Sequence, residues 1–172
     1  MFGRRRNIAG FTVLEILTTV LIVSVLATLS VVGFRKAIAH QRLTGDTNTA
    51  ISMVKYIGNE ARVSKREISV LIDLDQDLII GWLDHDSDGN VDSTEKIIDR
   101  MKTDSGVDLF SGAVGSSRIS SRRVFSFRDD GSTYRQIFLV LKSEVGDEYR
   151  GLLVNPNSGW VDMVKNVPSS FK

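Results

Sequence analysis

The sequence predicts an α+β fold in which one long N-terminal α-helix packs on an antiparallel β-sheet formed by the C-terminal part of the chain. Three observations lead to this prediction. Residues 11–34 form an unbroken apolar run, helical spacing of apolar residues continues to about residue 64, and short β-type segments follow. Strands do not alternate with helices along the chain, which excludes a parallel sheet built from βαβ units.

The apolar run contains 24 residues, and Glu15 is its only ionisable side chain. A helix of that length spans about 36 Å, enough to cross a hydrocarbon core of about 30 Å. Three arginines within residues 1–10 favour a cytoplasmic N-terminus and place the C-terminal bulk outside. The run is longer than the apolar region of a secretory signal, and no Ala-x-Ala cleavage pattern follows it. We therefore predict a single-pass membrane helix; a conventional cleaved signal peptide and a permanent anchor with an uncleaved leader remain as alternatives.

After residue 34 the helical pattern continues but becomes amphipathic. Apolar residues recur at spacings of three and four from Leu43 to Ala61, with charged side chains on the remaining surface. Gly45 weakens this half by about 1 kcal/mol relative to alanine without ending the helix. We predict one helix over residues 12–64, whose second half lies on the sheet.

The remaining residues are predicted to form strands. The expected strands are residues 68–74, 78–83, 96–101, 124–127, 137–141, 150–154 and 160–164, separated by turn-forming clusters of Asp, Gly, Ser and Asn. Residues 104–123 are rich in glycine and serine and are predicted to be a mobile surface loop. The expected organisation is a leader (1–10), a transmembrane helix (11–34), its amphipathic continuation (35–66) and a β-rich globular domain (67–172).

The N-terminus carries a family resemblance. A basic leader ending in Gly10, then Phe11, Glu15 and an apolar helix, resembles the start of type IV pilins and type II secretion pseudopilins. The resemblance implies that a prepilin peptidase cuts between Gly10 and Phe11, and that Phe11 is then N-methylated. It also implies that Glu15 pairs with the N-terminal amine of a neighbouring subunit during assembly.

The later part of the chain is similar to the GspH/FimT family of minor pilins and pseudopilins. The similar stretches are residues 41–43, 60–66, 81–82, 127–131 and 157–161. The resemblance implies a pilin-like, non-enzymatic structural subunit in the bacterial inner membrane, with its C-terminal domain in the periplasm or outside, and later in a filament. The implied partners are other pilins or pseudopilins, prepilin peptidase, the inner-membrane assembly platform and membrane lipid.

Residues 84–95 match the twelve-residue calcium-binding loop, with acids at its positions 1, 3, 5, 9 and 12 and glycine at position 6. Such a loop supplies the oxygen ligands that Ca²⁺ prefers. The same composition also suits a long hairpin turn, and its flanks are strands rather than helices. If the loop binds Ca²⁺, the ligands are the side chains of Asp84, Asp86, Asp88, Asp92 and Glu95 and the carbonyl of Asn90.

Composition restricts the other functions. The chain has no cysteine, which excludes disulfides, thiolate metal sites and a cysteine nucleophile; 22 basic against 21 acidic residues give a net charge of +1. Arg122, Arg123 and Arg128 stand near aromatic residues and could contact single-stranded DNA. An acid, Asp162, stands where DNA-binding FimT proteins have basic residues, so nucleic acid is not the expected partner. DNA uptake and a membrane-anchored calcium-binding domain remain as alternative functions.

Overall fold

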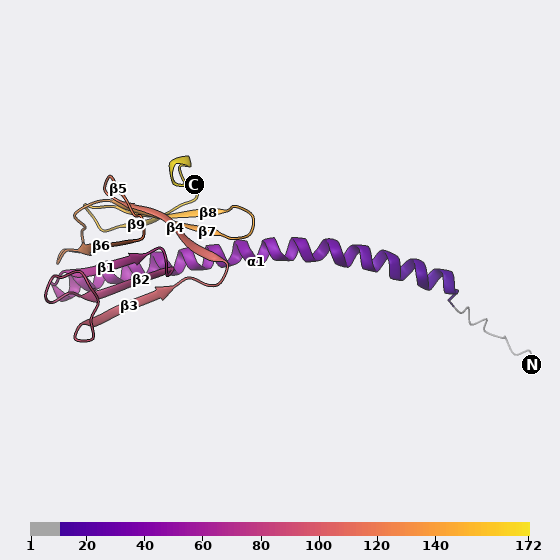
Figure 1. Ribbon diagram of the computed structural model, residues 1–172, viewed down its shortest axis with the longest axis horizontal. Helices are drawn as coiled ribbons and strands as arrows, with labels where there is room; N and C mark the ends of the chain where they lie inside the picture. Colours follow the sequence, from indigo (N-terminus) through magenta and orange to yellow (C-terminus); the bar gives the residue numbers. More distant parts are fainter. Residues whose placement is uncertain (1–10) are drawn as a thin grey trace, which may run out of the picture. The chain divides into compact units, whose positions relative to one another are not determined.

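The computed structural model describes residues 11–172, apart from the side chains of residues 29, 30 and 32. The expected leader, including Gly10, lies outside these residues. Contacts divide the chain into a part ending at Ala37 and a compact part, Ile38–Lys172. Figure 1 shows the single long helix and the strands that follow it.

The first element is helix α1, Val13–Ser64, with 52 residues. It confirms the continuous helix predicted over residues 12–64, and Gly45 does not interrupt it. The helix ends at a left-handed residue, Lys65, with φ of 55°, and the Arg66 N–H donates to the Ala61 carbonyl at 3.3 Å. This bond closes the last turn in the manner of a Schellman cap.

Nine strands and a short 3₁₀ turn follow the helix (Figure 1). The elements are β1 (Ile68–Asp73), β2 (Leu78–Leu83), β3 (Lys96–Lys102), β4 (Val107–Val114), β5 (Ser117–Arg118), β6 (Arg122–Phe127), β7 (Ile137–Ser143), β8 (Tyr149–Val154), β9 (Val161–Val164) and η1 (Ser169–Phe171).

The strands form two sheets rather than the single sheet that the sequence predicted. One has the order β3-β2-β1-β6 and the other β5-β4-β7-β8-β9, and all the neighbouring strands are antiparallel. The prediction of a mobile loop over residues 104–123 was wrong, because this segment contains β4 and β5. The glycines of this segment suggested a loop, but Gly112 lies within β4 and is closely packed. A Cβ there would lie 2.9 Å from the Phe138 carbonyl oxygen.

The main core lies between α1 and the two sheets. From the helix it takes Leu43, Ala50, Ile51, Met53, Val54, Ile57 and Ala61, which are the residues of the predicted amphipathic stripe together with Met53. Gly81 of β2 allows the helix to approach closely, because a Cβ there would lie 2.4 Å from Ile57 Cδ1. A second apolar cluster, Leu71, Leu78, Ile80 and Trp82, lies on the four-stranded sheet outside this core.

Stretches far apart in the sequence meet at the C-terminal end of α1. Arg62 Nε donates to the Asp130 carbonyl at 3.0 Å, and its Nη2 reaches the Ser158 carbonyl at 3.5 Å. A Cβ on Gly159 would lie 1.8 Å from the Gly131 carbonyl oxygen. The similar stretches 60–66, 127–131 and 157–161 therefore form one junction that fixes the end of the helix to two turns.

Candidate functional site

The N-terminus of α1 is closed by its own side chains. Thr12 Oγ1 accepts a hydrogen bond from the Glu15 N–H at 3.2 Å, while Glu15 Oε2 accepts from the Thr12 N–H at 3.5 Å. This reciprocal pair is a capping box, and it places a carboxylate at the positive end of the helix dipole. The Thr-x-x-Glu spacing could have predicted this role, which sequence reasoning missed. None of the ion pairs within residues 11–172 involves Glu15.

The first part of α1 presents an apolar surface. It contains a segment that is long and apolar enough to cross a membrane, and none of that segment is buried within the chain. Its hydroxyl groups bond within the helix: Thr18 to the Leu14 carbonyl at 3.0 Å, and Ser24 to the Val20 carbonyl at 2.7 Å. The segment can therefore enter lipid, or pack on similar helices, without leaving these hydroxyl donors unsatisfied.

The Asp-rich loop brings three of its six predicted ligands together. One carboxylate oxygen from each of Asp84, Asp86 and Asp88 lies within 4.8 Å of the others. Asp84 Oδ2 accepts from the Gly89 N–H at 3.2 Å, whereas Asp84 Oδ1 is buried and has no hydrogen-bond partner within the described residues 11–172. Three carboxylates this close repel one another unless a cation lies between them.

The carboxylates of two other predicted ligands, Asp92 and Glu95, have local partners instead. Asp92 Oδ1 accepts from the Thr94 hydroxyl and N–H at 2.6 and 2.7 Å, and these bonds lower the pKa of Asp92. Glu95 folds back onto the loop, where its carboxylate accepts from the N–H groups of His85 at 3.0 Å and Asp92 at 3.3 Å. The Asn90 N–H donates to Asp88 Oδ1 at 2.6 Å.

The same loop covers the second apolar cluster. Val91, at the eighth position of the loop, packs against the cluster that contains Trp82, and the Trp82 side chain is fully buried. The loop pattern predicts an inward apolar residue at its eighth position, but it does not place that residue on a sheet face. The packing of Val91 therefore couples the conformation of the loop to the burial of Trp82.

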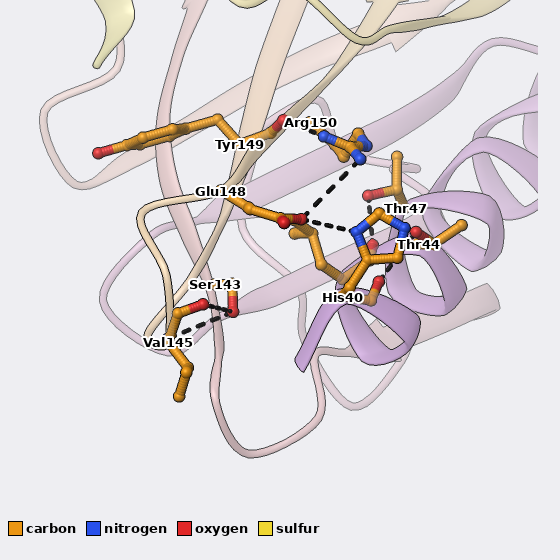
Figure 2. A network of polar contacts seen from close by, with 9 residues as sticks. His40, Thr44, Thr47, Ser143, Val145, Glu148, Tyr149 and Arg150 are labelled. Atoms are coloured by element: carbon orange, nitrogen blue, oxygen red, sulfur yellow. Dashed lines mark hydrogen bonds and ion pairs between the residues drawn. The ribbon is translucent and has the colours of Figure 1, made fainter. Parts of the chain in front are cut away.

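A polar network joins α1 to the β7–β8 hairpin. Figure 2 shows His40 facing Glu148, with Nδ1 2.7 Å from Oε2, and Arg150 Nη2 3.9 Å from the same carboxylate. Nearby, the Thr44 hydroxyl donates to the His40 carbonyl at 2.9 Å. These half-exposed groups fix the hairpin to the helix and show no nucleophile–base arrangement.

The three arginines considered for DNA lie on or next to β6 but have different surroundings. Arg122 Nε pairs at 2.8 Å with Asp73, which is buried. The Arg128 guanidinium lies 4.1 Å from the centre of the Tyr134 ring. Arg123 has no hydrogen-bond or ion-pair partner among residues 11–172. The three do not form one uninterrupted basic stripe.

Comparison with known proteins shows similarity of fold. No family model and no curated protein matches the sequence. Among solved structures, the minor pseudopilin EpsH of the Vibrio cholerae type 2 secretion system matches with a TM-score of 0.55 and 13% identity, over 72% of this chain and 97% of that one. The type IV minor pilin FimU of Pseudomonas aeruginosa matches with a TM-score of 0.54 and 14% identity, over 76% and 92% of the two chains.

The chain has the pilin-like fold. At these identities the likeness establishes the fold alone, and it confirms the α+β prediction of one long helix on antiparallel strands. Within this fold, the exposed part of α1 is long and apolar enough to cross a membrane.

Proposed function

We propose that this chain is a minor pilin or pseudopilin, a structural subunit of a type IV filament or of a type II secretion pseudopilus. The observation that carries the proposal is α1 itself. One 52-residue helix begins at a capping box, exposes an apolar surface and continues into the core of a pilin-like domain. Such a helix can anchor the precursor in the membrane and then pack on other subunits in a filament.

In this proposal, prepilin peptidase removes residues 1–10 and leaves Phe11 as an N-methylated terminus. The subunit then leaves the inner membrane through the assembly platform. Glu15 meets the amine of the adjacent subunit, and this buried pair sets the register of neighbouring helices more than it adds stability. The head-to-tail contact is heterologous, so the assembly grows without closing.

The test separates the charge of Glu15 from its capping role. Glu15→Gln keeps an oxygen that can accept the Thr12 N–H bond but removes the negative charge. We expect this variant to reach the membrane at the wild-type level and to be absent from sheared filaments, while the control Thr19→Ala is incorporated. Normal incorporation of Glu15→Gln would contradict the role of the Glu15 charge in assembly, whereas absence of the wild-type chain from filaments would favour a plain membrane anchor.

We also propose that the Asp-rich loop binds Ca²⁺ through Asp84, Asp86 and Asp88. The buried, unpartnered Asp84 Oδ1 supports this, because an all-oxygen cluster with a free acceptor suits a hard cation. Asp92, Glu95 and the Asn90 carbonyl complete the proposed ligand set by turning toward the ion. The bound ion would fix the loop over Trp82.

The calcium test uses thermal unfolding of the full chain in detergent after chelator treatment. We expect Ca²⁺ at about 100 times its Kd to add about 2.7 kcal/mol to the free energy of unfolding. The double variant Asp86→Asn/Asp88→Asn should lose this gain, whereas Asp129→Asn, at an exposed acid outside the loop, should retain it. An unchanged melting temperature of the wild type in Ca²⁺ would refute the site.

The alternative of DNA uptake predicts salt-dependent binding of single-stranded DNA that falls when Arg123 and Arg128 are replaced together by glutamine. Unlike Arg122, neither of these side chains pairs with a buried acid among residues 11–172, so the replacement should leave the fold intact. Filament incorporation of Glu15→Gln and DNA binding by this arginine variant are independent readouts of the two functions.

A further inference from the structure

Strand β6 lies at an edge of the four-stranded sheet, and one of its two sides is open. It pairs with β1 alone among the strands of residues 11–172, apart from one isolated bridge between Phe127 and Thr133 at its C-terminal end. The pairing with β1 has no register shift, whereas β3, at the opposite edge, pairs with β2 through an irregularity. No proline stands in β6. A regular edge of this kind offers unpaired N–H and C=O groups to another extended chain.

The hydrogen bonds show which residues of β6 face the open side. The Leu74 N–H donates to the Ser121 carbonyl at 2.8 Å, and these two residues continue the register of β1 and β6. Bonded and non-bonded positions alternate along an antiparallel pair. Backbone groups that point away from β1 therefore belong to every second residue, namely Arg122, Val124 and Ser126. Within residues 11–172, no hydrogen bond outside the strand pairs engages these backbone groups.

A cleft of about 270 Å³ lies beside this open edge. The bridge between Phe127 and Thr133 places the returning chain on the side of β6 that faces away from β1. The next residues of that chain form the second wall of the cleft. Its complete lining is Val114, residues 123–126, residues 133–135 and Ile137. The edge of β6 thus faces a hollow between the two sheets rather than open solvent alone.

The cleft has two cations, Arg123 and Arg135, and no acid in its lining. Both side chains are exposed, and neither guanidinium has a hydrogen-bond or ion-pair partner among residues 11–172. Arg123 comes from β6 and Arg135 from the opposite wall. Because side chains alternate along a strand, Arg123 shares its face of β6 with the buried ring of Phe125. Arginine binds carboxylates through two parallel hydrogen bonds.

We propose that a short extended segment of another protein adds to the open edge of β6. Its backbone would bond to the outward N–H and C=O groups of Val124 and Ser126. An acidic side chain of the segment would lie opposite Arg123 and reach Arg135, and an aliphatic side chain two residues away would lie opposite Phe125. Cross-strand pairs of opposite charge, and of an aromatic with a β-branched residue, stabilise such a pairing. The proposal does not depend on filament assembly, and its outcome is separate from that of the Glu15 test.

The edge favours a protein segment over nucleic acid. Another β-strand can both donate to and accept from backbone groups at alternate residues, which is the pattern that β6 presents. Single strands of nucleic acid instead need aromatic faces on which bases stack. Of the two aromatic residues in the lining, Phe125 is buried, and the Arg128 guanidinium lies 4.1 Å from the centre of the Tyr134 ring.

The experiment measures binding of a fluorescein-labelled peptide to the full chain in a non-ionic detergent. The probe is Thr-Val-Thr-Glu-Thr with an amidated C-terminus, and the control peptide has glutamine in place of glutamate. We expect the glutamate peptide to bind at least about tenfold more tightly, because hydrogen bonds to a charged group are the stronger ones. Added salt should weaken its binding, since exposed charges are screened.

Two further peptides test whether the backbone of the probe pairs with β6. One is N-methylated at valine and glutamate, and the other at the second and third threonines. Successive N–H groups of a strand point in opposite directions, so only one of these two sets can face β6. We expect one methylated peptide to bind at least about tenfold more weakly than the probe and the other to bind nearly as well, because each lost backbone bond costs on the order of 1 kcal/mol.

The variant Arg123→Gln/Arg135→Gln should weaken binding of the glutamate peptide by at least about tenfold, the scale of an interface hot spot. The control Lys102→Gln/Lys165→Gln removes the same charge outside the cleft and should leave binding unchanged. Arg122 is left intact because its loss would leave the buried Asp73 without its ion-pair partner. Melting temperatures verify that both variants are folded.

Four results would overturn the proposal. The first is no binding of the glutamate peptide, which would leave the two arginines the role of protecting a sheet edge. The second is equal binding of the glutamine peptide, or unchanged binding by the arginine variant. The third is an equal effect of the two N-methylated peptides, because binding would then not use the edge. The fourth is tighter binding of an oligothymidine strand that the arginine variant loses, which would assign the cleft to nucleic acid.

Discussion

At the scale of single residues, glycine positions test the packing most sharply. Gly159 has a φ of 65°, and a Cβ there would meet a backbone carbonyl at 1.8 Å. Gly45 lies in the exposed part of α1, with nothing within 4 Å of an added Cβ. Replacement by alanine is therefore expected to have opposite effects on the free energy of unfolding at these two positions.

Gly159→Ala should lower the free energy of unfolding by at least about 2 kcal/mol, because the left-handed backbone and the overlap with Gly131 both penalise a side chain. Gly45→Ala should raise it by up to about 1 kcal/mol through helix propensity. Urea unfolding of the two variants measures both changes. A neutral Gly159→Ala would show that the junction at the end of α1 is looser than the structure indicates.

A second prediction concerns Asp46, which is nearly buried on α1. Its Oδ2 accepts from the Asp104 N–H at 2.9 Å. Burial raises the pKa of its carboxyl above 3.8, and the charge of Asp104 adds to the rise, while this hydrogen bond and Arg42 oppose it. The folded chain therefore retains the Asp46 proton up to a higher pH than the unfolded chain does.

Because the folded pKa is raised, the stability linked to this proton is present below pH 3.8 and is lost as the pH rises through the folded value. Asp46→Asn removes the titration and keeps a carbonyl acceptor for Asp104. We expect the stability of this variant relative to wild type to increase from pH 3.5 to 6.5. Urea titrations at several pH values measure the difference, and a flat difference would contradict the prediction.

At the scale of elements, the C-terminal turn η1 covers the outer face of the five-stranded sheet. Phe171 packs edge-on against Phe138 with ring centres 4.8 Å apart, and its carbonyl accepts from the Ser111 hydroxyl at 2.8 Å. The turn thus adds apolar burial on a sheet face away from α1.

Phe171→Ala should destabilise the domain by about 1–3 kcal/mol, because it removes the ring contact and part of the buried apolar area. Ser170→Ala is the matched control, since Ser170 contributes only its carbonyl, to Arg118. Chemical unfolding compares the two. An effect of Phe171→Ala no larger than that of the control would mean that the turn is not stably docked.

The elements also show what sequence can predict here. The period of apolar residues predicted α1 to within one residue at its start, because a long helix repeats its signal many times. Strand β4 was missed because Gly106, Gly112 and Gly115 suggested a loop. The strand has glycine at position 112 because its neighbours in the folded domain leave no space for a Cβ, and this packing cannot be read from the local sequence.

The candidate sites also divide into those that local sequence spacing predicts and those that depend on the fold. The Thr12–Glu15 cap and the grouping of Asp84, Asp86 and Asp88 follow from spacing within a few residues of the sequence. The contact of His40 with Glu148 joins two residues that are 108 positions apart in the sequence. No local pattern contains that contact, so it could not be predicted before the fold was known.

At the scale of the whole molecule, one chain combines an exposed apolar helix surface with a folded β-rich domain of pilin-like architecture. The two parts differ in their packing: the apolar segment of the first is not buried within the chain, while the second has an apolar core of its own. The proposed function accounts for the exposed apolar surface, because lipid would cover it in the precursor and neighbouring helices would cover it in the filament.

The central claim is tested most directly by intact-mass and N-terminal analysis of the protein purified from its own membranes. The proposal predicts a chain of 162 residues that begins at N-methylated Phe11, because residues 1–10 of the 172 are removed. A chain that retains residues 1–10, or one cut after Phe34, would contradict processing by prepilin peptidase and with it the filament function.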